Sequence, residues 1–187
     1  AGYIFWPEAS HTDTLLLEYF TENAWSKDAV DHLRVLDGFC AGRYGVQADA
    51  MKAIWKDVIP MSYLLDWGDN YGCHLMAETI DREQHGKDKG AKGLDHWQAT
   101  LKDVKNVFAA LSKVDWQGEA IRRDTVDLAR TALDRLIILG TKELCAGCAA
   151  WAHGERGPEG LAGKADEIAV LAEKMADVLA LHTDYSL

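Results

Sequence analysis

Apolar residues recur along most of the chain at the three- and four-residue spacing of an amphipathic helix. This pattern predicts helices over 12–25, 28–44, 49–58, 94–111, 119–153 and 161–182. The longest of them, 119–153, carries too many apolar residues for one narrow stripe, which indicates a helix covered on more than one side. We therefore predict an all-α fold, a bundle or array of about six helices packed on one another.

The first residues depart from the helical pattern. An aromatic and β-branched run over 3–6 predicts a short strand, and Pro7 ends its hydrogen bonding. Glu8 then stands at the end of that strand, where it either serves chemistry or is a solvated charge favoured by the start of the next helix. We assign residues 1–11 to this strand and loop, and residues 12–187 to the helical domain.

Capping residues and glycines divide the helical domain further. The segment 26–28, Ser-Lys-Asp, predicts an N-cap and an acidic first turn for the second helix, and Gly45 predicts its end. Pro60 predicts a kink or a boundary. The apolar rhythm fails over about 68–94, which predicts a long irregular excursion on the surface.

Composition and charge exclude several classes of partner. The chain has 187 residues, of which 48% are hydrophobic, and a net charge of −10 with its basic residues scattered. We therefore expect no nucleic-acid partner. No apolar stretch reaches the length of a membrane span, so we expect no membrane partner. Because the chain opens at Ala1 without a methionine, we expect further residues upstream.

The spacing Cys145-x-x-Cys148, with His153 close behind, is the one candidate metal motif. A zinc site needs four such ligands to converge, and Cys40 or Cys73 would have to supply the rest. The pair lies in the middle of a helical pattern, where two small core residues are the simpler interpretation. We predict no metal and no cofactor, with a thiol-based metal or redox protein as an open alternative.

Aromatic and histidine side chains give two candidates for binding. Most tryptophans fit helix faces or helix ends, which favours core packing or helix-end contacts; these are Trp25, Trp55, Trp97, Trp116 and Trp151. Trp6 differs because it stands beside Pro7 and Glu8, where it either stacks on a sugar ring or packs within the strand. His11, three residues after Glu8, is placed to donate to a substrate hydroxyl.

Several segments together resemble the family 89 glycoside hydrolases, the α-N-acetylglucosaminidases. They are Pro7-Glu8, Glu22-Asn23-Ala24-Trp25, Ser26-Lys27-Asp28-Ala29-Val30, the run 39–46 with Ala50 and Trp55, the run 123–130, and 171–187. The similarity is strongest over 5–59, weaker over 95–187 and absent over about 68–94. Two departures stand out: Ala9 follows Glu8 where the family usually has glycine, and Trp6 replaces a small residue.

The resemblance implies a fold and an activity. The chain would comprise the last strand of a catalytic (β/α)₈ barrel and part of an all-helical C-terminal domain. Glu8 would be the nucleophile of a retaining glycosidase that removes terminal α-linked N-acetylglucosamine from glycans, with Trp6 and His11 binding the substrate. The motif 43–45, Arg-Tyr-Gly, would be structural, an arginine-anchored helix end. Extracellular, periplasmic or lysosomal localisation is implied in the same way.

A retaining glycosidase needs a second carboxyl group about 5–5.5 Å from the first to act as acid and base. In the family that residue belongs to an earlier barrel strand, which this chain lacks. The partners implied are therefore a glycan and the missing barrel of the same protein, and the 187 residues alone are expected to be inactive. The alternative is a helical interaction or scaffold module without catalysis.

Overall fold

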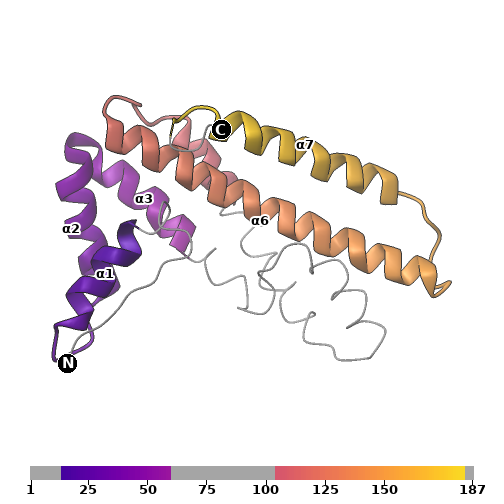
Figure 1. The fold of residues 1–187 in the computed structure, drawn as a ribbon, viewed down its shortest axis with the longest axis horizontal. Helices are drawn as coiled ribbons and strands as arrows, with labels where there is room; N and C mark the ends of the chain where they lie inside the picture. Colours follow the sequence, from indigo (N-terminus) through magenta and orange to yellow (C-terminus); the bar gives the residue numbers. More distant parts are fainter. Residues whose placement is uncertain (1–13, 60–103, 184–187) are drawn as a thin grey trace.

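A computed structural model describes residues 14–59 and 104–183, and over these ranges the protein is all-α (Figure 1). This confirms the predicted fold class. The described ranges contain no strand. The strand predicted within 1–11 and the irregular excursion predicted over 68–94 both lie outside the described residues.

Three short helices precede the two long ones. The first group comprises α1 (Thr14–Ala24), α2 (His32–Tyr44), the 3₁₀ turn η1 (Gly45–Gln47) and α3 (Ala48–Val58). Residues 104–111 are also helical. Helix α6 (Glu119–Ala152) then crosses the molecule, and α7 (Leu161–Leu179) returns along it (Figure 1). The turn after α7 reaches the start of α6, where His182 Nε2 lies 2.8 Å from Glu119 Oε1.

Helix α2 begins later than its capping signal predicts. Its N-cap is Asp31, whose carboxylate accepts a hydrogen bond from the Leu33 amide at 3.0 Å, so the predicted start at 26–28 is wrong. The reason lies in the preceding helix: Asn23 Oδ1 accepts from the Val30 amide at 3.1 Å and fixes the link between α1 and α2 in a non-helical path.

Two glycines end helices as the sequence predicts. Gly45 follows α2 at φ 54° and ψ −120°, a backbone conformation that residues with a Cβ rarely adopt. Gly154 follows α6 at φ 73° and lets the Glu155 amide donate to the Ala150 carbonyl at 2.9 Å. Each glycine therefore reverses the chain so that the next helix packs beside the last one.

The core lies where α2, α3, the helical residues 104–111 and the first half of α6 meet. Its fully buried members include Leu36, Met51, Ile54, Val104, Val107 and Leu128. On α6 the residues 124–129 are all buried in succession, which confirms that this helix is covered on more than one side. The apolar face predicted on α7 is only half-buried, and no residue of α7 is buried completely.

The tryptophans divide between core and surface. Trp55 is buried as predicted, whereas the core interpretation is wrong for Trp25 and Trp151, whose exposed fractions are 75% and 53%. Trp25 directly follows α1 and Trp151 lies in the last turn of α6, so both have the helix-end position that was the other interpretation. Trp97 lies outside the described residues. Of the helices described, none combines the length and the low polarity needed to cross a membrane.

The contrast between Gly45 and Gly42 allows a matched test of the helix end. Changing Gly45 to Ala should lower the free energy of unfolding by about 1–3 kcal/mol, because a residue with a Cβ is strained in this backbone conformation. Gly42 lies inside α2 with no atom within 4 Å of an added Cβ. Gly42→Ala should therefore stabilise the protein by about 0.4–1 kcal/mol. Urea unfolding measures both, and equal effects would contradict the assignment of Gly45.

Candidate functional site

The most ordered polar cluster joins three helices at the edge of the core. The last turn of α2 supplies Phe39, Arg43 and Tyr44, the middle of α3 supplies Trp55, and the first turns of α6 supply Asp124. Because Gly45 ends α2 immediately after Tyr44, the following residues turn back and bring Trp55 of α3 beside Tyr44. We call these five residues the Asp124 cluster.

Asp124 is the centre of the hydrogen bonds. Both of its oxygens receive the guanidinium of Arg43: Nη2 donates to Oδ1 at 3.0 Å and Nε donates to Oδ2. The Tyr44 hydroxyl also donates to Oδ2, at 2.7 Å, and accepts in turn from Trp55 Nε1 at 2.9 Å. The carboxylate, which is only 3% exposed, is thereby saturated with donors, as a buried charge requires.

The aromatic rings complete the cluster. Phe39 meets both Tyr44 and Trp55 edge-on, with ring centroids 5.8 Å apart in each pair. The Arg43 guanidinium carbon lies 5.6 Å from the centroid of the Phe39 ring. The arginine is therefore held by a carboxylate in its plane and an aromatic ring beside it.

The surroundings of Arg43 and Tyr44 keep both side chains protonated. The hydrogen bond to Asp124 raises the pKa of Arg43, so the guanidinium stays charged. Burial raises the pKa of Tyr44 far above its usual value, and the negative charge of Asp124 acts in the same direction. Tyr44 is therefore a permanent hydroxyl donor. The raised pKa values of Arg43 and Tyr44 suit a structural role better than proton transfer.

A second buried carboxyl lies one turn further along α6. Asp127 accepts from Arg130 Nε at 3.1 Å, and burial raises its pKa, opposed by the charge of Arg130. Between the two acidic residues, the hydroxyl of Thr125 is buried without a hydrogen-bond partner. The first half of α6 thus carries an unusual concentration of buried polar groups.

The residues predicted to bind or act on substrate lie outside the described part of the chain. This holds for Glu8, Trp6 and His11, and the structure therefore does not test whether they share a cleft. The candidate metal motif is described in part: Cys145 and Cys148 lie on α6, where Cys145 is buried and Cys148 is partly buried. Within the described residues, no group of three or more His, Cys, Asp or Glu could hold a metal ion.

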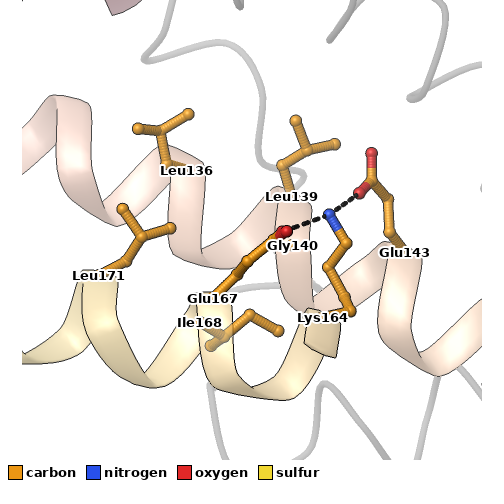
Figure 2. Close-up of a pocket in the computed structure, with 8 residues that line it drawn as sticks. All are labelled: Leu136, Leu139, Gly140, Glu143, Lys164, Glu167, Ile168 and Leu171. Carbon is orange, nitrogen blue, oxygen red and sulfur yellow. Dashed lines mark ion pairs between the residues drawn. The ribbon is translucent and has the colours of Figure 1, made fainter. Parts of the chain in front are cut away.

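A shallow groove of about 240 Å³ lies between α6 and α7 (Figure 2). Leucines from both helices line it, and Lys164 of α7 stands at one end. Its ammonium group is shared between Glu143 of α6 at 2.9 Å and Glu167 of α7 at 3.0 Å (Figure 2). The charged groups of this groove are therefore paired with one another and tie the two helices together.

Comparisons of the chain with protein-family models, with curated proteins and with solved structures found no match.

Sequence reasoning identified one half of the Asp124 cluster. The motif 43–45 was interpreted as an arginine-anchored helix end, but nothing in the sequence indicated which residue anchors the arginine. Asp124 lies 81 residues away from Arg43, in the run 123–130 that resembles the glycosidase family. An acidic residue among buried apolar neighbours on a helix was the available signal, since such a residue needs a partner.

Breaking the Arg43–Asp124 pair should lower the free energy of unfolding much more than breaking a surface ion pair does. Arg43→Met leaves the Asp124 carboxylate buried without its main cation and should cost about 3 kcal/mol of unfolding free energy. Asp177→Asn, which removes the exposed pair between Lys174 and Asp177 on α7, should cost less than about 1 kcal/mol. Urea unfolding of both variants is the measurement. Equal losses in the two variants would contradict the central role of the pair.

Asp127 should make stability depend on pH with a defined sign. Its pKa in the folded protein is raised above the ordinary carboxyl value, so the folded state holds this proton more tightly than the unfolded chain does. The contribution of Asp127 to stability therefore falls as pH rises through and above about 4. The stability of the wild type relative to Asp127→Asn should decrease from pH 4 to pH 7 in urea unfolding. An increase over that range would contradict the burial argument.

Proposed function

We propose that the chain is the C-terminal part of a retaining glycoside hydrolase that removes terminal α-linked N-acetylglucosamine from glycans. In this proposal Glu8 is the nucleophile, Trp6 and His11 contact the sugar, and the helices form a domain that packs against the catalytic barrel. The acid and base carboxyl group belongs to residues upstream of Ala1. Secretion, or delivery to the periplasm or lysosome, is part of the same proposal.

One observation carries the proposal: two pieces of the resemblance, one from the stronger region 5–59 and one from the weaker region 95–187, meet in space. The motif 39–46 ends α2 and the motif 123–130 opens α6, and they are joined by the Arg43–Asp124 ion pair. Residues that share a hydrogen-bonded cluster constrain each other. Contact between two motifs from distant parts of the chain therefore supports the interpretation that they belong to one domain. This supports a shared helical domain, and the activity follows from the resemblance alone.

The helical domain would serve the reaction indirectly. A glycosidase nucleophile must be held within a fraction of an ångström of its productive position, and its support comes from rigid packed elements. Helix α1 begins six residues after Glu8, and it packs against α2, which the Asp124 cluster fixes to α6. In the proposal, the nucleophile is therefore carried on a strand whose next element, α1, packs against α2 of the helical domain.

An interaction or scaffold module is the second candidate, and exposed apolar side chains favour it. Val46 is completely exposed and Trp116 is 38% exposed. Their two loops are joined because the Gln47 side chain accepts from the Asp115 amide at 2.9 Å and donates to its carbonyl at 2.7 Å. The gene separates the candidates: coding sequence for a barrel upstream of Ala1 favours the glycosidase, and a reading frame that starts near Ala1 favours the scaffold.

The decisive experiment replaces Glu8 in the complete polypeptide. Glu8→Gln should lower turnover of p-nitrophenyl N-acetyl-α-glucosaminide by about 1,000-fold or more, because the covalent intermediate cannot form. Glu8→Ala should regain release of p-nitrophenol when azide is added, since azide can attack the anomeric carbon in place of the carboxylate. Glu173→Gln, on α7, is the matched control and should keep full activity.

Two results would overturn the proposal. The first is full activity in the complete polypeptide after Glu8→Gln. The second is hydrolysis by the 187 residues alone, since a single carboxylate cannot supply both the nucleophile and the acid.

A further inference from the structure

Helix α1 is attached to the rest of the fold more weakly than any part of the core. It has eleven residues, fewer than an isolated helix needs to be stable in water, and none of them is buried. Leu15 is the residue of α1 that packs against the core cluster, and it does so only partly buried. The helical conformation of α1 therefore depends on its contact with α2.

Among the described residues, two polar contacts join α1 to α2 and to the link before it. Arg34 Nη2 of α2 lies 2.8 Å from Glu22 Oε2, and the Val30 amide donates to Asn23 Oδ1 at 3.1 Å. Both contacts are exposed to water, and the Arg34 side chain is 65% exposed. An exposed ion pair contributes about 0.2–1 kcal/mol and weakens in salt. These exposed contacts differ from the Asp124 cluster, whose carboxylate is buried and fully hydrogen-bonded and which holds α2 to α6.

The core cluster that Leu15 contacts is apolar and includes the thiol of Cys40 on α2. Cys40 is 1% exposed and belongs to the core cluster against which Leu15 packs. Burial raises the pKa of Cys40 to about 12, and Glu18 of α1 is among the charges that act on it. Leu15 and Glu18 are three residues apart, so they share the face of α1 that packs against the core cluster.

We propose that α1 is a detachable helix, which undocks from α2 as a unit while α2, α3 and α6 stay folded, and thereby uncovers the surface of α2 around Cys40. Proteins open locally where few apolar contacts and exposed polar contacts hold a segment. The ion pair between Glu22 and Arg34 makes the opening sensitive to ionic strength. The inference concerns the described helices alone and does not depend on the glycosidase proposal.

Thiol labelling tests the proposal because Cys40 reports the opening. The native chain is treated with iodoacetamide, and the modification of Cys40 and of the buried Cys145 on α6 is followed by peptide mass spectrometry, so that no cysteine is replaced. Cys40 should react much faster than Cys145, which is equally buried but lies on α6. Amide hydrogen exchange should show α1 exchanging at the rate of Cys40 labelling while α3 stays protected.

Variants of the ion pair give the second arm of the test. Glu22→Gln should speed Cys40 labelling by about 1.5- to 5-fold, the range that an exposed ion pair supports, without changing Cys145. About 1 M sodium chloride should have a similar effect on the wild type and little effect on Glu22→Gln. Lys174→Gln removes an exposed pair on α7 and is the matched control; it should leave Cys40 labelling unchanged.

The proposal is overturned if Cys40 and Cys145 react at one common rate, because the only opening is then global. It is also overturned if α1 and α3 exchange their amides together. A Glu22→Gln variant that labels at the wild-type rate at low and high salt would remove the role assigned to the ion pair.

Discussion

The fold depends on one buried charge and its partners. Asp124 enters the interior on α6, and a lone carboxylate in that position would cost several kcal/mol. Arg43 and Tyr44 remove that cost by donating to both of its oxygens, and they come from consecutive positions at the end of α2. Because both donors are needed together, the end of α2 has one allowed position against α6. Apolar packing alone would not fix that position so narrowly.

A gradient of stability follows from this arrangement. Around the Asp124 cluster, α2, α3 and the first half of α6 share fully buried side chains. Further out, α7 is only half-buried against α6 and is assisted by Lys164, which bridges carboxylates of the two helices (Figure 2). Helix α1 has no buried residue. Local opening should therefore begin at the periphery, since the free energy of opening follows the burial that it disrupts.

Periodicity and glycine predicted the helical elements well. Helices near 14–24, 48–58, 119–152 and 161–179 were all indicated by apolar spacing, and Gly45 marked the end of α2 because few other residues tolerate its backbone conformation. The start of α2 was missed for a local reason. Ser26 and Asp31 are both good N-caps, and the Asn23 side chain favours Asp31 because it accepts from the Val30 amide and keeps the link non-helical.

The candidate site was predictable only in part, because its pairing is long-range. Arg43 and Asp124 are 81 residues apart, and the spacing of apolar residues does not show which charge on one helix meets which charge on another. The core interpretation of the surface tryptophans failed for a similar reason: helical spacing places Trp25 just after one helix and Trp151 within another, but it does not show whether a further element covers them. Which two charged residues pair is decided by how the helices pack. The sequence shows such a pair only as a polar residue at a position where an apolar one is expected.

The buried Arg43–Asp124 pair fixes the arrangement of α2 on α6, although burying two charges is costly. Replacing a buried ion pair with well-packed apolar residues is often neutral or stabilising, so the pair is weak evidence of optimised stability. Its directional hydrogen bonds, however, penalise every shifted arrangement of α2 on α6, because a shift by one turn would strand the Asp124 carboxylate. Two helices joined only by leucines can slide between similar packings. The cluster therefore selects a single arrangement, and the weaker contacts of α1 and α7 are built on that fixed core.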